Sequence, residues 1–398
     1  MLYTADTVID DIEETREYFF NLHENTSALK DLSHYWPKLP TMDMGPSALA
    51  RVLFNTSLAI ERLANEPDGM RLSLKYRDYV VSNFGDLWIN DYKILNRGHA
   101  QDINKTLSAF NKLRLKPSGS MFEKFESRIV TDAEDYRLDS SSDSMLAFSQ
   151  LAYMPETALP VLEEHFFSGL ADPKPRSLVK MYWAAAVQEA IAKEEVPFSR
   201  HVHEVLSRAF SHLTQTQMEK NFSRNDDRAQ LNDASQWFTG EPIMPRPKTD
   251  NRQSTWEGYL RDIFAKASDY DLESTDTYLP NLGKWSDFAF RVNGHTVHLE
   301  ADGPLHFNNH FRTDDYRWNG NTLFQSALVA KTHPDDVQLH LPFFAYQNAV
   351  QKGMSTDLIG HELCQLLCRA AHQAEADPEM RTMSIHYSAN AGFCFKPL

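Results

Sequence analysis

Cysteine, long apolar runs and glycine-rich loops are all scarce in this chain of 398 residues. Its three cysteines are odd in number and too few for a disulfide framework, so we expect an intracellular, reducing compartment such as the cytoplasm. No apolar run approaches the roughly 18 residues that span a bilayer, so we expect no membrane partner. No P-loop and no dinucleotide-binding glycine motif is present, which argues against the enzyme classes built on them.

Positive charge is scarce as well, both overall and at the start of the chain. The 40 Lys and Arg residues against 55 Asp and Glu give a net charge of −15, which argues against indiscriminate binding of polyanions. Residues 1–19 are acidic and contain no basic leader segment. We therefore expect neither a secretory nor a mitochondrial presequence.

The basic residues are nevertheless concentrated between positions 91 and 130, where eight of them stand against four acids. This basic island consists of Lys93, Arg97, Lys105, Lys112, Arg114, Lys116, Lys124 and Arg128. A basic island in an acidic protein is compatible with a selective nucleic-acid surface. A solvated helix face is the alternative for any single one of these residues.

The N-terminal half has the hydrophobic period of helices, near 3.6 residues. The clearest segments are residues 47–63, 102–113, 144–151 and 178–191. A longer period of 38 residues relates three of these helices, because Leu107, Met145 and Trp183 are evenly spaced, as are Ala109, Ala147 and Ala185. Helical hairpins that repeat in this way cannot bury their apolar faces singly, so they stack into a solenoid.

Periodicity fades over residues 221–253, where proline, asparagine and aspartate accumulate, and we interpret this stretch as a linker. The region after it alternates between helix and strand patterns. The predicted elements are a helix at 254–268, a hairpin at 287–307, a helix at 321–331, a strand at 337–341 and a helix at 357–374.

The hairpin carries the most informative residues of the chain. Asn293-Gly294 is a strong signal for a two-residue turn, because both central residues of a type I′ turn need a positive φ. Such a turn pairs Val292 with His295, Phe290 with Val297 and Asp287 with Glu300. Alternation along the strands then puts Asp287, His298, Glu300 and Asp302 on one face. Directly opposed carboxylates destabilise a sheet unless they are exposed or a cation lies between them.

The run Glu-Ala-Asp-Gly-Pro-Leu-His-Phe at 300–307 resembles the signature of the RAP domain, and the resemblance covers about residues 285–346. RAP domains are similar to PD-(D/E)XK nucleases of the very-short-patch-repair type. The 38-residue period resembles octotricopeptide repeats and the helical region of FAST-kinase-domain proteins, which precede RAP domains in proteins of RNA metabolism. Repeats followed by a RAP-like C-terminus make a stronger match than either part alone.

The resemblance implies roles for the acids of the hairpin. Asp287, Glu300 and Asp302 would bind Mg²⁺ or Mn²⁺, and His306 would serve as a general acid or phosphate ligand. The chain departs from the pattern twice. Position 302 holds Asp where the superfamily has a catalytic lysine, and Gln325 stands where a basic residue usually begins the next helix. These departures weaken the case for cleavage more than the case for binding.

A polar loop after the signature adds candidate nucleic-acid contacts. Arg312, Arg317 and Trp318 suit phosphate contact and base stacking, and a plain surface loop is the alternative.

The predicted fold class is α plus α/β, an N-terminal α-solenoid followed by a small PD-(D/E)XK-like α/β domain. We divide the chain into a helical region at 1–95, repeats at 96–220, the linker at 221–253 and a RAP-like domain at 254–398. The predicted function is binding of single-stranded RNA, with a possible metal-dependent endoribonuclease activity. Two alternatives remain open: a catalytically inactive scaffold with a protein partner, and a metal-dependent DNA endonuclease.

Overall fold

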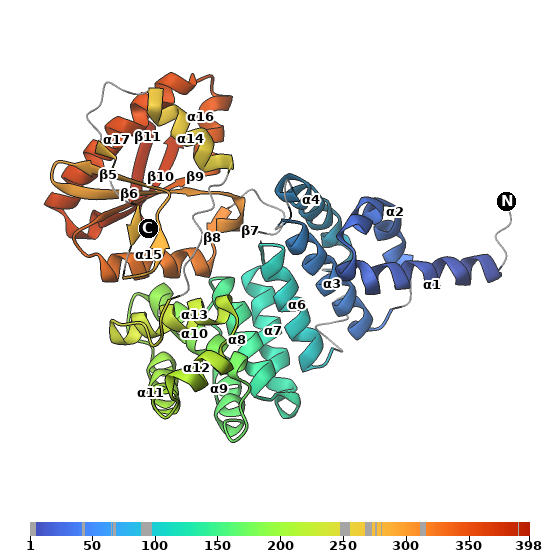
Figure 1. Ribbon diagram of the computed structural model, residues 1–398. Helices are drawn as coiled ribbons and strands as arrows, with labels where there is room; N and C mark the ends of the chain where they lie inside the picture. Colours follow the sequence, from blue (N-terminus) through green and yellow to red (C-terminus); the bar gives the residue numbers. More distant parts are fainter. Residues whose placement is uncertain are drawn as a thin grey trace. The chain divides into compact units, whose positions relative to one another are not determined.

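The architecture is known from a computed structural model, which describes residues 5–41, 44–64, 66, 69–88, 98–246, 255–266, 273–274, 277–279, 281–310, 316–388 and 390–398. The chain forms two compact units: unit 1 is Met1–Gln188 with Asn308–Gly320, and unit 2 is Glu189–Phe307 with Asn321–Leu398. Helices dominate the first half and a mixed sheet lies in the second, as the coarse fold class predicts (Figure 1). Within the described part of the chain, no helix has the length and apolar character needed to cross a bilayer.

Unit 1 is built mainly from helices. They are α1 (Ala5–Asn21), α2 (Leu32–Tyr35), α3 (Pro46–Ala64), α4 (Gly69–Trp88), α6 (Ala100–Lys112), α7 (Gly119–Thr131), α8 (Leu138–Gln150), α9 (Leu159–Ser168) and α10 (Pro175–Ala192), whose last turn passes into unit 2. Strand β1 (Leu115–Lys116) pairs in parallel with β7 (Phe307–His310), which lies beside β8 (Tyr316–Trp318). Residues 308–320, which the sequence suggested belong to a C-terminal domain, are therefore grouped with the helices.

The 38-residue period is visible in the backbone. Helices α6 and α8 begin one period apart, and the apolar side chains at equivalent positions are buried, including Leu107 and Met145. The chain adopts a left-handed conformation at Arg114 (φ 53°) and again one period later at Ala152 (φ 51°). Hydrogen bonds also join α6 to α8, where Asn104 donates to the Ser140 carbonyl at 3.1 Å, and α8 to α10, where Ser149 donates to the Ala184 carbonyl at 3.3 Å. The repeats thus pack through small and polar residues as well as apolar ones.

Unit 2 contains a six-stranded sheet in the order β11-β10-β9-β6-β5-β2. Its strands are β2 (Glu273–Ser274), β5 (Phe288–Val292), β6 (His295–Asp302), β9 (Val337–Pro342), β10 (Thr382–Ser388) and β11 (Gly392–Pro397), with a separate ribbon of β3 (Tyr278–Leu279) and β4 (Lys284–Trp285). Its helices are α11 (Pro197–Ser211), α12 (Gln215–Asn221), α13 (Asn225–Thr239), α14 (Thr255–Lys266), α15 (Gly320–Thr332), α16 (Phe343–Gln351) and α17 (Thr356–Ala376). Strand β9 runs parallel to β6 and β10, and the other pairings are antiparallel.

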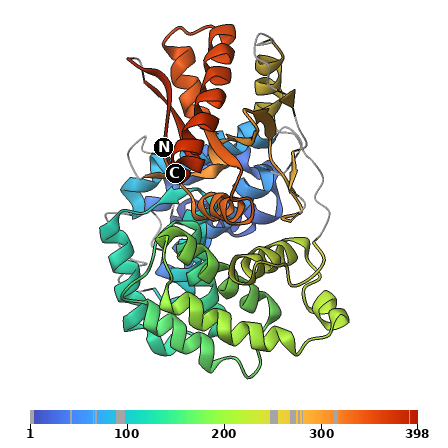
Figure 2. The same ribbon diagram turned by 90° about the vertical axis from the view of Figure 1, so that its left-hand side faces the viewer.

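The predicted hairpin register is confirmed. Val292 pairs with His295 and Phe290 with Val297, and the turn residues Asn293 and Gly294 have φ values of 51° and 87°. Helices α14, α16 and α17 cover the apolar face of the sheet, whereas α15 lies on the other side (Figure 1). Figure 2 shows the orange helix α15 again on the opposite side of the sheet from the red α17. Both faces of β6 are therefore buried, including the predicted polar face.

The helices predicted at 254–268, 321–331 and 357–374 and the strand at 337–341 are confirmed as α14, α15, α17 and β9. The structure also differs from the predictions at other places. The stretch interpreted as a linker contains α13, whose buried side is largely polar, with Asn232, Asp233 and Gln236 each at most 4% exposed. Strands β10 and β11 follow the last predicted helix, where the sequence suggested no element.

A buried carboxylate fixes the junction between two repeats of unit 1. Glu126, on α7 and 3% exposed, accepts hydrogen bonds from the Tyr153 hydroxyl and from the backbone N–H groups of Thr157 (2.6 Å) and Ala158 (2.9 Å). Glu126→Ala would leave these three donors, of which the Ala158 N–H is buried and the other two are partly buried, without their acceptor and should destabilise the protein by about 3 kcal/mol. Thermal and urea unfolding measure the effect. Glu123→Ala, at an exposed position one turn earlier, is the control, and an equal loss in both variants would contradict the prediction.

Candidate carboxylate–histidine site

The candidate site lies at the C-terminal end of β6. Glu300 and Asp302 lie two residues apart on this strand. Asp287 immediately precedes β5, the antiparallel neighbour of β6. The parallel strand β9 places His340 in register with Glu300. The hairpin turn and the parallel pairing thus bring together four side chains that span more than fifty residues of sequence.

Asp302 is buried, at 1% side-chain exposure, and contacts two histidines. Its Oδ1 lies 2.6 Å from His306 Nδ1, and its Oδ2 lies 2.7 Å from His340 Nδ1. Burial alone would raise the pKa of Asp302, but the His340 and His306 imidazoles outweigh burial and hold this pKa below its ordinary value. Asp302 is therefore an ionised, internally compensated carboxylate.

His340 is held from its other side by helix α15. Its Nε2 lies 2.9 Å from the Ser326 hydroxyl, which donates to the Gln338 side chain at 3.0 Å. The connection from Ser326 through His340 to Asp302 has the order of a hydrolase triad, which no pattern in the sequence indicated. Ser326 and His340 are at most 3% exposed, so no substrate reaches the serine and the chain of contacts serves to position Asp302.

A second buried series of contacts, again from a serine through a histidine to an aspartate, lies in the same sheet. His298 contacts the Ser286 hydroxyl through Nδ1 (3.0 Å) and Asp336 through Nε2 (3.1 Å). Ser286 and His298 are also almost fully buried, at 3% and 2% exposure. This arrangement holds the start of β5 against the sheet and offers no accessible nucleophile.

Asp287 and Glu300 have the opposite electrostatic character to Asp302. Burial, reinforced by the nearby Glu257, raises the pKa of Asp287 to about 7, although the Ala301 N–H donates to it at 2.7 Å. Burial and repulsion from Asp287 raise the pKa of Glu300 well above its ordinary value. Glu300 is half-buried and makes no hydrogen bond or ion pair with any residue that the structure describes.

A metal ion could be held here by two carboxylates. Among the described residues, no group of three or more His, Cys, Asp and Glu side chains is placed to hold an ion, and both oxygens of Asp302 already contact histidines. Asp287 and Glu300 remain, and a bound cation would favour their ionised forms. Mg²⁺ commonly takes only one or two protein carboxylates and completes its shell with water and substrate phosphate. Asp287 and Glu300 would be two oxygen ligands of such an ion.

The basic island is mostly engaged within unit 1. Lys112 pairs with Glu61, Lys116 donates to the Ala152 carbonyl at 3.0 Å, and Arg128 pairs with Asp132 at 2.7 Å. These contacts fix the side chains in the repeat packing and reduce the charge available to a ligand.

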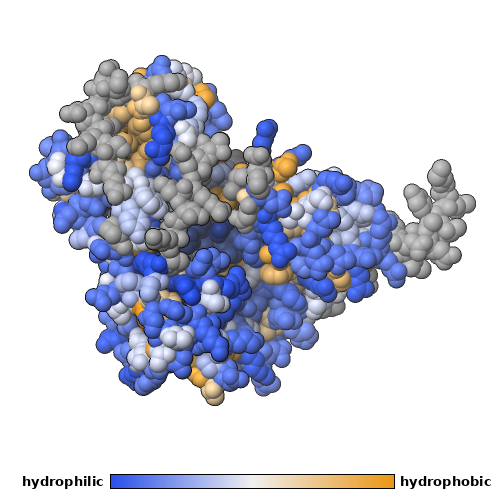
Figure 3. Space-filling model, in the orientation of Figure 1, coloured by the Kyte–Doolittle hydropathy of each residue, from blue (hydrophilic) through white to orange (hydrophobic). Residues whose placement is uncertain are grey.

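The other predicted nucleic-acid contacts vary in accessibility. Burial lowers the pKa of Arg114, Lys105 is half-buried, and Lys124 and Arg317 are exposed, with Trp318 partly so. Lys93, Arg97 and Arg312 lie outside the described residues. The visible surface is mostly hydrophilic, with apolar side chains in small groups (Figure 3).

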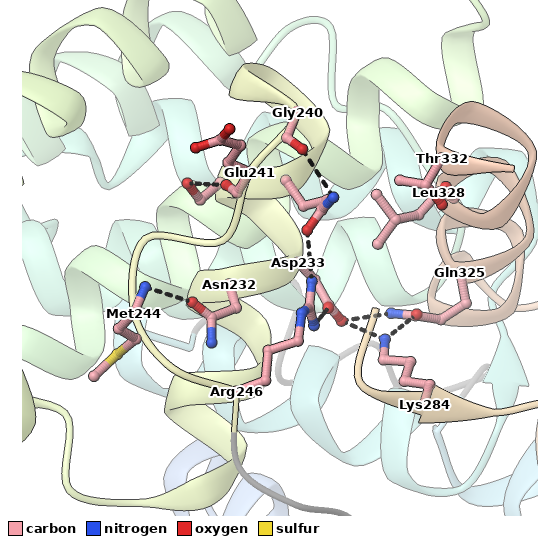
Figure 4. A network of polar contacts seen from close by, with 12 residues as sticks. Asn232, Asp233, Gly240, Glu241, Met244, Arg246, Lys284, Gln325, Leu328 and Thr332 are labelled. Carbon is pink, nitrogen blue, oxygen red and sulfur yellow. Dashed lines mark hydrogen bonds and ion pairs between the residues drawn. The ribbon is translucent and has the colours of Figure 1, made fainter. Parts of the chain in front are cut away.

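Gln325 lies beside a cation that the sequence did not reveal. The Lys284 ammonium contacts Gln325 and Asp233, and Gln325 also donates to Asp233 at 3.0 Å (Figure 4). A lysine of β4 thus lies beside the helix position at which the resemblance predicts a basic residue. A two-residue strand gives no sequence signal for such a placement.

No protein-family model matches this chain, and no curated protein sequence matches it.

The raised pKa values predict how stability changes with pH. A carboxyl whose pKa is raised on folding favours the folded state below its unfolded pKa of about 4, and this contribution is lost as pH rises through its folded pKa. Glu300→Gln removes the penalty, so it should stabilise the protein by about 2 kcal/mol near pH 8 and much less near pH 4.5.

Urea unfolding at the two pH values, without divalent ions, makes the measurement. Asp262→Asn, on the exposed side of α14, also removes one negative charge and serves as the matched control. Equal stabilisation by both variants would mean that the effect comes from net charge alone and would contradict the prediction.

Proposed function

We propose that the chain binds RNA and that unit 2 hydrolyses a phosphodiester bond with a divalent metal ion held by Asp287 and Glu300. One observation carries this proposal: Glu300 lies among other carboxylates, half-buried, with no compensating partner among the described residues. Uncompensated buried charge is costly, and it is commonly retained where a ligand or ion provides the compensation.

The neighbouring groups suit a reaction at phosphate. A bound ion would stabilise negative charge on the phosphate and favour ionisation of a water molecule. His306 has a 46% exposed side chain, and its Nδ1 is anchored on Asp302. That anchor orients the ring, so His306 can bind phosphate or donate a proton to the leaving oxygen. His340 and Ser326 keep Asp302 in place.

RNA is preferred as the polymer because of two resemblances acting together. The run at 300–307 is similar to the RAP signature, and the 38-residue period, now seen in α6 and α8, is similar to RNA-binding helical repeats. The order helix, three antiparallel strands, helix and parallel strand, formed by α14, β2, β5, β6, α15 and β9, is compatible with a PD-(D/E)XK-like core. Lys124, Arg317 and Trp318 would contribute contacts on unit 1.

A cleavage assay tests the proposal. Labelled single-stranded RNA and duplex DNA are incubated with the protein in Mn²⁺ or in EDTA, using wild type, Glu300→Gln and the control Asp262→Asn. We expect RNA cleavage in Mn²⁺ only, reduced by about 10² or more in Glu300→Gln and unchanged in the control.

The other outcomes decide between the alternatives. Cleavage of duplex DNA alone would make the protein a DNA endonuclease. RNA binding that weakens steeply with salt but leads to no cleavage would leave an RNA binder with an inactive site. Neither binding nor cleavage would refute the proposal and favour a protein-interaction scaffold.

His306→Ala should separate chemistry from binding. Loss of a general acid costs about 10²-fold in rate, whereas RNA affinity should change little because one exposed imidazole adds little charge. Single-turnover rates and equilibrium binding in EDTA measure the two effects. His295→Ala, at the N-terminal end of β6, is the control, and a rate loss as large as that of His306→Ala would count against a specific role for His306.

A further inference from the structure

A polar groove in unit 2 is separate from the carboxylate site. It encloses about 980 Å³, near the upper end of the range for small-molecule sites, and lies between the chain after α13, the β3–β4 ribbon and the end of α15. The lining includes Gln236, Glu241, Arg246, Tyr278, Lys331 and Thr332. Cationic, neutral polar and aromatic groups therefore share one concave surface.

Positive charge exceeds negative charge around this groove. A single carboxylate, Asp233, is shared by Arg246 (2.7 Å) and Lys284 (2.6 Å), which approach it from two sides (Figure 4). With Lys331 and Glu241 included, three cationic side chains stand against two acidic ones. Burial alone would raise the pKa of Asp233, but Lys284 and Arg246 outweigh burial and hold this pKa below its ordinary value. Among these five side chains, the cationic groups outnumber the acidic groups by one.

The two cations that line the groove are held in place. Arg246 is 10% exposed, and its Nη2 donates to Gln236 at 3.2 Å, but its buried Nε finds no acceptor among the residues that the structure describes. A Cβ on Gly283 would come within 2.8 Å of the Arg246 side chain, so this glycine allows close packing against the arm of the arginine. Lys331 donates to the Trp237 carbonyl at 2.5 Å, with its ammonium 4.3 Å from the centre of the Trp237 ring.

An exposed aromatic pair adjoins these cations. Tyr278, which lines the groove, and Trp285 face each other across the β3–β4 ribbon with ring centres 4.9 Å apart. They are 38% and 40% exposed. Exposed rings beside cations can stack a base while the cations bind phosphate.

We infer that this groove binds a nucleoside phosphate, with the phosphate at Arg246 and Lys331 and the base against Tyr278. The ligand is either a free mononucleotide or the phosphorylated terminal nucleotide of a strand, which share this chemistry. The inference does not rest on the catalytic proposal, because binding here requires neither a divalent ion nor Glu300.

Isothermal titration calorimetry of the full chain in EDTA tests the inference, with the four ribonucleoside monophosphates, inorganic phosphate, the nucleosides and a 5′-phosphorylated oligonucleotide as probes. We expect nucleotides to bind at least about tenfold more tightly than phosphate or nucleoside alone. Tighter binding of the oligonucleotide would assign the groove to strand ends, and equal or weaker binding would assign it to free nucleotides.

The variants are chosen at exposed positions so that folding is preserved. Lys331→Gln and Tyr278→Ala should each weaken binding about tenfold, whereas Lys352→Gln, exposed elsewhere in the same unit, should not. Circular dichroism confirms that each variant folds. Absence of nucleotide binding, or binding unchanged in both groove variants, would overturn the inference. Because Glu300→Gln should bind nucleotide normally, this test and the cleavage assay fail independently.

Discussion

The arrangement of the candidate site depends on how the buried charge of Asp302 is compensated. A carboxylate removed from water is strongly disfavoured unless partners replace its hydration. Two imidazoles do so here, one from the turn after β6 and one from β9, and Ser326 of α15 secures the second. Three segments distant in sequence are thereby held at one end of the sheet. The position of His306, the exposed member of the group, follows from the same contacts.

The acids of unit 2 differ in how their charge is compensated. Asp302 has two histidines and Asp233 has two cations, so both remain ionised with a lowered pKa. Glu300 has no such partner among the described residues, and its pKa is raised. The same domain thus compensates two carboxylates internally and leaves a third unsatisfied. An acid retained at a cost to stability is a better functional candidate than one that is fully paired.

Local signals made part of this structure predictable. Asn293-Gly294 fixes the hairpin register through backbone conformation alone, and apolar periodicity suffices for α14, α15 and α17. Helix α13 was not predicted because its buried side is made of Asp, Asn and Gln, which are stable there only through long-range ion pairs and hydrogen bonds. The roles of His340 and Lys284 were not predicted for the same reason. Strand pairing and helix packing determine their partners, and the local sequence contains no signal for either.

Helix α15 supports both polar regions of unit 2 through consecutive residues. Gln325 contacts Asp233 and Lys284 beneath the groove, whereas Ser326 contacts His340 behind the carboxylate site. Adjacent helical residues project about 100° apart, so one helix can serve two separate networks. A substitution in this helix that shifts its axis would disturb both networks at once. Its effect could not be assigned to either network. Exposed side chains such as His306 and Tyr278 each belong to one region only. Substitutions there therefore test the carboxylate site and the groove separately.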